Sequence, residues 1–484
     1  MEEATARPGL TSGDLTVSVV DDGVGRRLRV VAPAAHLLGG FDGRAAETAD
    51  GTVLEGPLSP RNATAVRQHL PWLTPRPLGL VTSAGVGDRL GLATPGHVRA
   101  FRRHGADVAP VFAQQSAREM DRLDRSPQQV LDDATFGCVQ AGWDRPVGAD
   151  ADHLKTTEDL DRGLEAGFSM FTLDPGDHVR PTSANPRRPD LAELPWGALE
   201  DDPEAMTRRY TGKMLDLGSR QLRMDEENVL RAAAKYGPAV AQTVAMYRHL
   251  VERALHPVEV EVAVDETAEP TTVVEHLYMV SEMSRLGVRM VSFAPRYVGG
   301  FEKAVDYIGS IDTFAGSLAE HAHLAQSLGP YKLSLHSGSD KFSLYEAVVD
   351  ATGPLVHVKT SGTSYLEALA VTAHVSPGLF REIYRVSQDA YRAARASYQV
   401  SARLERTPAP EEVPDADLPG LVTAPDSRQI LHVGYGAVLT WRDADGAKRL
   451  DEELRALLHR ESDTYAEHLE RHFARHLRPF SGAR

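Results

Sequence analysis

Short apolar runs rich in Val, Ile and Leu alternate along the chain with longer amphipathic stretches. Several runs are apolar throughout, which is typical of strands that are buried on both faces of a parallel sheet. Helical periodicity lies between the runs, for example over residues 271–287 and 377–404. This strand–helix–strand repetition predicts an α/β fold with right-handed crossovers. The predicted strands are residues 78–83, 108–113, 146–152, 168–174, 258–266, 289–295, 332–338, 355–360 and 430–436.

The number of internal strands favours a (β/α)8 barrel of the TIM type over an open, doubly wound sheet. We expect residues 78–405 to form this barrel and residues 1–77 to be an N-terminal extension that packs on it. Residues 185–256 have little strand character and are interpreted as a helical insertion. Residues 406–420 are rich in proline and acidic, which predicts a surface linker, and residues 421–484 are expected to complete the barrel with a strand and a helix.

Four histidines lie on the last predicted helix, residues 451–477: His459, His468, His472 and His476. The last three follow one another at intervals of four residues and therefore share one face of a helix. Because Arg and Glu residues surround them, we interpret this face as solvated, or as an oligomer contact, rather than as a metal site.

Composition excludes several classes of function. The 484 residues include 53 Lys and Arg against 68 Asp and Glu, a net charge of −15, which argues against a nucleic-acid-binding protein. The single cysteine, Cys138, cannot form an intramolecular disulfide or a CxxC motif. The N-terminus lacks a signal-peptide pattern, and no apolar run approaches the ~18 residues that span a membrane. We therefore expect a soluble, cytoplasmic protein, and its 19 histidines raise the question of metal or acid–base chemistry.

Polar residues, most of them ionisable, gather at the ends of most predicted strands. The carboxyl ends of barrel strands converge on one mouth, where the active sites of such barrels lie. These residues are Asp150, Asp152, His153, Lys155 and Thr156 after the third strand, Asp174, Asp177, His178 and Arg180 after the fourth, Asp265 and Glu266 at the fifth, Arg296, Glu302, Lys303 and Asp306 after the sixth, His336, Ser337, Asp340 and Lys341 at the seventh, and His357, Lys359 and Thr360 at the eighth.

Individual members of this set have structural alternatives. Asp152 with His153, and the Asp265–Thr267 segment, could cap the helices that follow them. His357 shares a strand face with Lys359, and it could face the barrel interior or be a core histidine with its bonds satisfied. His336, directly after an apolar strand, is better explained as a ligand or a catalytic group.

The donor types indicate a borderline divalent ion. Imidazole and carboxylate are the ligands expected for Zn, Mn, Ni or Co. The sequence has no HExxH or EF-hand spacing, so such a site would have to be assembled from separate strands. Lys and Arg residues at the same mouth indicate an anionic or polyhydroxylated substrate, and Arg296 suits bidentate binding of a carboxylate.

Several longer strings resemble the tagaturonate/fructuronate epimerase family, which is related to the tagatose (fructose) 4-epimerases. They lie between about residue 78 and residue 370, and they are GVGDRLGLATPGH, APVFAQQSAREM, GADADHLKT, FTLDPGDHV, VAVDET, FEKAVDYIG, LSLHSGSDKFS and HVKTSGTSYLEAL. The resemblance implies a metal-dependent epimerase on a barrel. It implies an acid/base pair of Asp152 and Glu266. It also implies metal ligands at His153, His336 and, in preference to Asp306, Glu302.

The expected reaction interconverts D-tagaturonate and D-fructuronate, which differ at C4. That carbon is not acidified by the C2 ketone, so we expect retro-aldol cleavage and re-addition rather than direct proton abstraction. A neutral ketohexose 4-epimerase, a metal-dependent aldolase and a non-catalytic sugar-binding barrel are the alternatives, and a homo-oligomer is one option for assembly. The residues expected to bind the sugar are Lys155, Asp174, Arg296, Ser337, Asp340 and Lys359.

Overall fold

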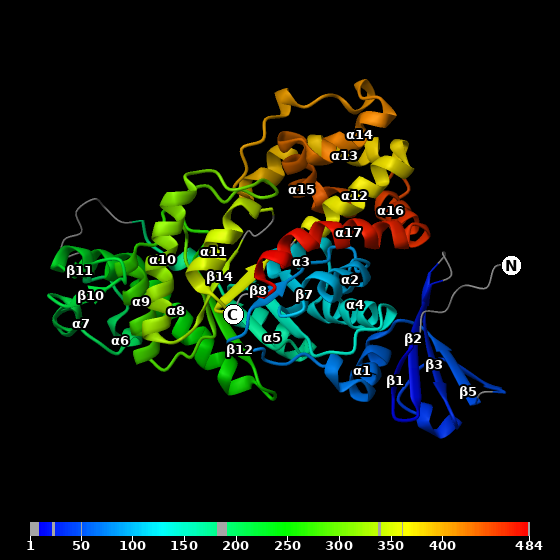
Figure 1. Cartoon of the computed structure of the whole chain (residues 1–484), viewed down its shortest axis with the longest axis horizontal. Helices are drawn as coiled ribbons and strands as arrows, with labels where there is room; N and C mark the ends of the chain where they lie inside the picture. Colours follow the sequence, from blue (N-terminus) through cyan, green and yellow to red (C-terminus); the bar gives the residue numbers. More distant parts are fainter. Residues whose placement is uncertain are drawn as a thin grey trace.

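Eight parallel strands close into a barrel at the centre of the molecule (Figure 1), which confirms the predicted fold class. The computed structural model describes residues 9–21, 25–49, 51–181, 191–336, 340–360 and 362–482. The strands follow one another around the barrel in chain order, and β9 pairs with β12 at the point where the insertion interrupts the sequence. They are β6 (Ser83–Gly85), β7 (Ala109–Ser116), β8 (Gly148–Leu154), β9 (Met170–Leu173), β12 (Glu259–Ala263), β13 (Ser292–Ala294), β14 (Lys332–Leu335) and β15 (Val356–Lys359).

Helices connect these strands and cover the outside of the barrel. Three of them begin at a capping box: the N-cap residue is Ser126 for the helix that starts at Pro127, Thr156 for the helix after β8 and Thr272 for the helix after β12. Asp152, His153 and the Asp265–Thr267 segment are therefore not the N-caps of these helices. The helices are α2 (Thr94–His104), α3 (Ala117–Leu123), α4 (Pro127–Gln140), α5 (Thr157–Ala166), α8 (Glu226–Arg253), α9 (Val273–Arg285), α10 (Ile311–Leu328), α11 (Tyr345–Thr352) and α12 (Thr363–Val375).

A separate antiparallel sheet precedes the barrel. Its strand order is β1-β2-β3-β5-β4, and alternate residues of β5 are buried, as expected for a sheet with one face on a core. The following helix, α1 (Pro60–His69), packs against α4 of the barrel. The strands are β1 (Leu10–Ser12), β2 (Leu15–Asp21), β3 (Arg26–Ala32), β4 (Arg44–Thr48) and β5 (Gly51–Gly56).

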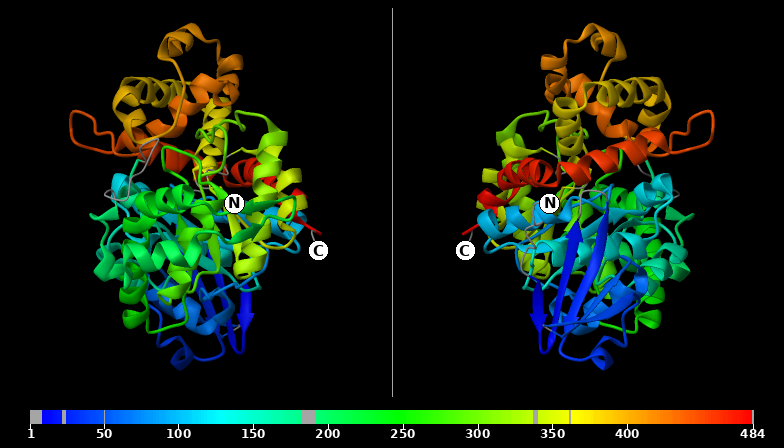
Figure 2. Two further views of the ribbon diagram at one scale, coloured as in Figure 1. Left: turned by 90° about the vertical axis from the view of Figure 1, so that its left-hand side faces the viewer. Right: turned by 90° about the vertical axis from the view of Figure 1, so that its right-hand side faces the viewer.

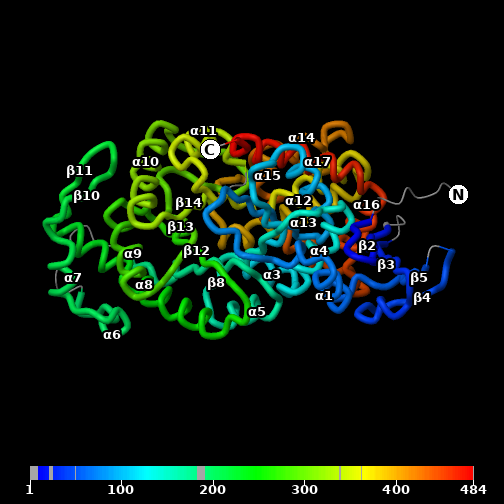
Figure 3. The backbone as a smooth tube through the Cα atoms, turned by 60° about the horizontal axis from the view of Figure 1, so that its bottom comes forward, coloured from blue at the N-terminus to red at the C-terminus, as the bar shows by residue number. Residues whose placement is uncertain are grey.

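The segment expected as a helical insertion divides into two parts. Its first part contains α6 (Trp196–Leu199), α7 (Pro203–Tyr210) and a hairpin of β10 (Met214–Asp216) with β11 (Gln221–Arg223), at the end of the molecule away from the N-terminal sheet (Figure 3). The second part, α8, packs against α5 and α9, so it serves as the crossover helix between β9 and β12. The hairpin strands have three residues each, too few for an alternating pattern to be visible in the sequence.

The C-terminal part is helical, and the predicted strand at residues 430–436 was wrong. These residues lie inside α15 (Pro425–Leu439), where Ile430 to Tyr435 are all buried. A short run that is buried all round cannot be distinguished from a strand by its periodicity. Figure 2 shows the helical segment around residues 380–435 and the N-terminal sheet at opposite ends of the molecule.

The predicted helix over 451–477 divides at Glu461 into two helices. The C-terminal part also contains short 3-10 turns between residues 395 and 417. Within the described residues, no helix is long and apolar enough to cross a membrane. The remaining helices of this part are α13 (Pro377–Ala394), α14 (Leu418–Thr423), α16 (Arg449–Arg460) and α17 (Ser462–Leu477).

Candidate active site at the barrel mouth

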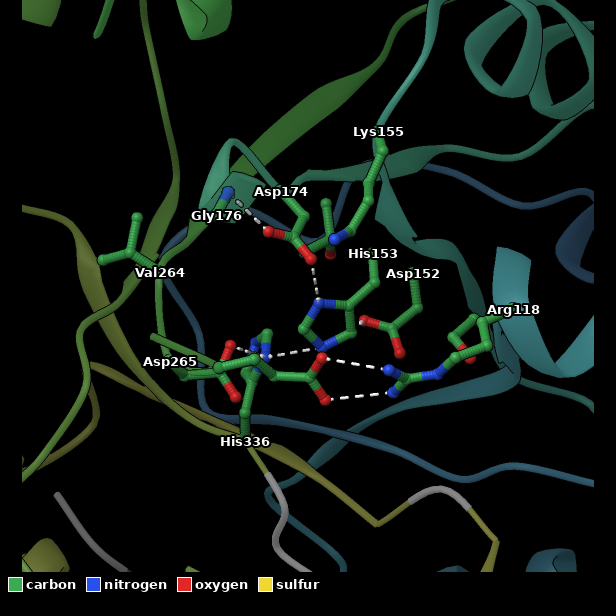
Figure 4. A network of polar contacts seen from close by, with 12 residues as sticks. Arg118, Asp152, His153, Lys155, Asp174, Gly176, Val264, Asp265 and His336 are labelled. Carbon is green, nitrogen blue, oxygen red and sulfur yellow. Dashed lines mark hydrogen bonds and ion pairs between the residues drawn. The ribbon is translucent and has the colours of Figure 1, made fainter. Parts of the chain in front are cut away.

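Asp152 and His153 are adjacent in β8, and both side chains reach the mouth of the barrel (Figure 4). Adjacent residues of a regular strand point to opposite faces of a sheet. Here the register between β8 and β9 shifts between Ala151 and Leu154, and His153 has a left-handed φ of 51°. This local irregularity allows one strand to deliver a carboxylate and an imidazole to the same place, and backbone strain of this kind is concentrated at functional sites.

His153 and His336 face each other across the mouth. The Nε2 atom of His153 lies 3.2 Å from Nδ1 of His336. The other ring nitrogen of His153 contacts Asp174 at 3.1 Å, and that of His336 contacts Glu261 at 2.5 Å. A carboxylate behind each imidazole fixes the ring and leaves the opposite nitrogen facing the site, as in the outer shell of many metal centres.

Lys359 lies beneath this pair, inside the barrel. Its Nζ atom contacts Asp150 at 2.7 Å, Asp152 at 2.8 Å and Glu261 at 2.7 Å. Burial alone would lower the pKa of Lys359, but the three carboxylates outweigh burial and raise it well above its usual value. The same ammonium, with the neighbouring histidines, holds the pKa of Asp152 below its ordinary value despite burial. Lys359 therefore positions carboxylates and keeps Asp152 ionised.

Asp265 and Glu266 both line the cavity because β12 has already ended at Ala263. The carboxylate of Glu266 receives two hydrogen bonds from Arg118, at 3.2 and 3.0 Å, and lies 3.5 Å from Nζ of Lys303. Burial would raise the pKa of Glu266, but these cations and His153 lower it. Glu266 is thus an ionised carboxylate with 29% of its side chain exposed.

A cavity of about 300 Å³ opens beside these carboxylates, a volume at the lower end of the range for small-molecule sites. Arg296 forms part of its wall, and burial lowers the pKa of this guanidinium. Within the described residues, Arg296 forms no ion pair and its buried Nε has no hydrogen-bond partner. The C-terminal segment 396–399 closes one side of the cavity, and Tyr398 stacks on Arg118.

Three residues that were predicted to belong to the site, Glu302, Lys155 and Asp340, have their main contacts elsewhere. Glu302 is held by Ser401 and Gln429, with Oε2 at 2.6 Å from Ser401 Oγ, and it does not join the groups that could bind an ion at the mouth. Glu302 lies in the long loop after β13, and the hydrophobic pattern of the strands does not predict the direction in which a loop side chain points. Lys155 forms an ion pair with Asp177 at the surface.

Asp340 does not line the mouth cavity, and its carboxylate pairs with Arg428 at 2.5 Å. Ser337 falls outside the described residues. Asp174 and Lys359 are at the site, but they bind His153 and the buried carboxylates respectively.

Sequence reasoning missed three residues of this site: Glu261, which pairs with Lys359, Gln114, which donates to Asp152 at 3.1 Å, and Arg118. Asp150 was expected at the mouth, but its pairing with Lys359 was not. Glu261 had a usable signal, because the V-E-V-E-V alternation of residues 258–262 places a charged face inside a closed barrel. No such signal exists for Arg118, because it is the second residue of α3 and its position on a helix does not indicate that it reaches the mouth.

The electrostatic field at the mouth favours a cation. Burial would lower the pKa of both histidines, but Asp152 and Asp174 raise that of His153 to about 10, and Asp265 and Glu261 raise that of His336 to about 9. Two imidazole nitrogens 3.2 Å apart cannot both point a proton at each other. Asp152, His153 and His336 form one group of potential ligands, and His153, Asp174 and Glu266 form another. The donor set thus fits a divalent ion of the zinc type.

Comparison with known proteins gives matches over most of the chain. A family model described as UxaE, tagaturonate epimerase, matches residues 20–480. The tagaturonate/fructuronate epimerase of Thermotoga maritima is 43% identical over 414 residues, which cover 85% of this chain and 84% of that protein. The native crystal structure of fructuronate-tagaturonate epimerase UxaE from Cohnella laeviribosi has a TM-score of 0.90 at 32% identity, covering 98% of this chain and 95% of that one. The structure of the same Cohnella protein with two glycerol molecules has a TM-score of 0.89 at 32% identity, covering 99% and 96%.

Proposed function

Because the chain belongs to the tagaturonate epimerase family, we propose that it is an isomerase that interconverts D-tagaturonate and D-fructuronate by inverting C4. One observation supports this most directly: an ionised carboxylate, one histidine of a facing pair and an arginine without an ion pair in the described residues line one cavity, and the second histidine lies 3.2 Å behind the first. These groups suit, in turn, a proton transfer, a cation and a substrate carboxylate.

The proposed chemistry is a retro-aldol reaction. A carboxylate removes the proton of the O4 hydroxyl, the C3–C4 bond breaks, and its electron pair forms an enediolate over C2 and C3. The aldehyde at C4 rotates, the enediolate attacks its opposite face, and O4 regains a proton. The C4–H bond stays intact throughout, and no oxidant or reductant is consumed.

We assign the proton transfers to Asp152 and Glu266. Both have lowered pKa values, so each begins as a proton acceptor at neutral pH. Glu266 faces the open cavity, where a substrate hydroxyl can reach it. Asp152 lies deeper, where Lys359 and Gln114 fix its two oxygens.

We further propose that His153 and His336 hold a divalent ion. When bound, such an ion supplies Lewis-acid stabilisation of negative charge on the substrate. Asp152, rather than Glu302, is grouped with the two histidines as a possible third ligand, and its Oδ1 lies 3.9 Å from Nε2 of His153. The variant Asp152→Asn separates the two roles: loss of the metal identifies a ligand, and loss of turnover with the metal retained identifies an acid/base group.

Arg296 is the residue best placed to bind the C6 carboxylate of the substrate. Lys155 is already paired with Asp177, and Lys359 is enclosed by three carboxylates. Arg296 is half-buried in the cavity wall, where a bidentate contact with a carboxylate is strong because water is largely excluded. This favours the uronates over neutral ketohexoses as substrates.

The test uses protein stripped of metal and reloaded with single ions, assayed with tagaturonate, fructuronate, tagatose and fructose. We expect conversion between the two uronates with at least one ion and far slower conversion of the neutral sugars. No conversion under any ion would overturn the assignment, and release of free three-carbon fragments as the main products would indicate an aldolase. In D₂O, deuterium incorporation at C4 would exclude the retro-aldol route.

A further inference from the structure

A second pair of buried histidines lies away from the mouth, on α17. His472 and His476 are one helical turn apart, and they face Asp340 from the loop after β14. The two Nε2 atoms are 3.2 Å apart, and they lie 3.5 and 3.7 Å from Oδ1 of Asp340. All three side chains are buried, at 6%, 1% and 8% exposure, and none lines the mouth cavity.

The other ring nitrogens of this pair are occupied. Nδ1 of His472 lies 3.3 Å from Glu367 on α12, and Nδ1 of His476 lies 2.6 Å from the hydroxyl of Tyr345 on α11. When each Nδ1–H donates to its oxygen, each Nε2 carries a lone pair directed at the gap. An acceptor behind each imidazole is the outer-shell arrangement typical of metal-binding histidines.

Asp340 completes the arrangement from the barrel side. Its Oδ2 accepts from Arg428, whereas its buried Oδ1 has no hydrogen-bond donor among the described residues. An oxygen that is buried without a donor is costly, and a cation in the gap would satisfy it. Three lone pairs from two separate parts of the chain thus converge on one point.

We propose that Asp340, His472 and His476 form a second divalent-cation site, of the zinc type. Tetrahedral zinc, with ligands at about 2.1 Å, separates its ligand atoms by about 3.4 Å, which is close to the separations found here. Two imidazoles and one carboxylate leave a fourth position, which a water molecule fills. Nitrogen donors favour zinc-like ions over Mg²⁺ or Ca²⁺, which prefer oxygen ligands.

The position in the fold assigns this site a structural role. Asp340 belongs to the barrel, and the two histidines belong to the last helix of the chain, which packs on α2 and α12. An ion shared between them ties the C-terminal helices to the loop after β14. His336 of the mouth is the first residue after β14, so Asp340 follows it four positions later in the chain.

A shared proton is the alternative occupant of the gap, and counting bound zinc separates the two. Full-length protein is stripped with a chelator, loaded with Zn²⁺ and analysed for zinc per chain. We expect His472→Gln to bind one equivalent less than its parent, both in wild type and in a His336→Gln background. His468→Gln, one turn earlier on the same helix, is the matched control and should lose no zinc. Equal zinc content with and without His472 would overturn the proposal, whatever the mouth binds.

A second variant keeps the test decisive if His472→Gln does not fold. Glu367→Gln leaves all three ligands in place, and we expect it to weaken zinc binding at this site by about ten- to a hundredfold. Thermal unfolding of the His336→Gln protein should show a zinc-dependent rise in Tm that Glu367→Gln shifts to higher zinc concentration. An unchanged zinc dependence would contradict the site.

Discussion

The two histidine pairs of this molecule have the same local geometry and different surroundings. In each, the facing nitrogens are 3.2 Å apart and the distal nitrogens contact an oxygen. At the mouth, His336 lines a cavity of about 300 Å³ together with Glu266 and Arg296, and His153 lines the smaller pocket that adjoins it. The pair on α17 is buried among Asp340, Glu367 and aromatic rings such as Phe342, and it does not line the mouth cavity.

This difference shows that donor type does not determine what a cation site does. A catalytic site keeps a coordination position that substrate can reach and places proton-transfer groups next to it, whereas a structural site is closed. Only the mouth pair meets the first condition. Each of the following changes alters one of the pairs, or a group beside the pair at the mouth, to test this distinction.

The largest expected effect comes from removing one histidine of each pair. His336→Gln should lower kcat/KM by about 10³-fold or more, since Lewis-acid stabilisation supplies several kcal/mol at the transition state. His472→Gln, assayed below its Tm, should change kcat/KM by less than about tenfold. Steady-state kinetics with both uronates measures this. Similar losses in the two variants would mean that the α17 pair takes part in catalysis.

Glu266→Gln tests the proton-transfer group that only the mouth possesses. We expect kcat to fall by about 10²- to 10⁴-fold with little change in KM, because the amide cannot accept the O4 proton. Metal content should stay the same. Glu269→Gln, three residues further on and largely exposed, is the control and should retain wild-type kcat. Full activity of Glu266→Gln would remove it from the mechanism.

The barrel and much of its mouth could be predicted from the sequence because both follow from local patterns. Continuous apolar runs mark buried parallel strands, and polar residues directly after them mark the mouth. Asp152, His153 and His336 were found this way. The contacts of Glu302 with Ser401 and Gln429 could not be predicted, since a long loop separates Glu302 from β13 and these contacts depend on tertiary structure.

For the histidines of α17, the sequence predicted the local structure but not the burial. Their spacing correctly predicted that they share a helix face, but the face was interpreted as solvated because charged residues surround it. The structure buries His472 and His476 against the loop after β14, so that interpretation was wrong for these two. Helical periodicity gives the face of a helix, and only packing decides what covers it. His468, one turn before His472 on α17, is only half-buried.

Arg296→Met tests substrate selection at the mouth. Loss of a charged hydrogen bond costs about 1.5–3 kcal/mol, so KM for the uronates should rise by about ten- to a hundredfold. Activity on neutral ketohexoses, where detectable, should not fall. Arg296→Lys retains the charge without the bidentate geometry and should lie between the two. Steady-state kinetics on the four sugars measures this, and equal effects on uronates and neutral sugars would contradict a role in carboxylate binding.

The smallest expected effect is a difference in how the two pairs respond to pH in metal-free protein. At the mouth, folding raises the pKa of His153 to about 10, so the folded state binds this proton more tightly than the unfolded state. The resulting stabilisation is complete below the unfolded pKa of about 6.5 and disappears as pH rises through about 10. On α17, burial, which outweighs Asp340, lowers the pKa of His476 to about 4. Its stabilisation is therefore present above about 6.5 and is lost as pH falls towards 4.

The difference in Tm between wild type and variant isolates each contribution, at chelator concentrations that keep both pairs free of metal. For His153→Gln the difference should shrink as pH rises from 7 towards 10, and for His476→Gln it should shrink as pH falls from 7 towards 4. Each change should amount to a few degrees at most, because a single group contributes little to the unfolding of a chain of this size. Opposite slopes follow directly from the surroundings of the two pairs: at the mouth carboxylates outweigh burial, and on α17 burial outweighs the nearby carboxylate. Parallel slopes would show that both pairs experience the same field, and the distinction drawn between them would then rest on access to the cavity alone.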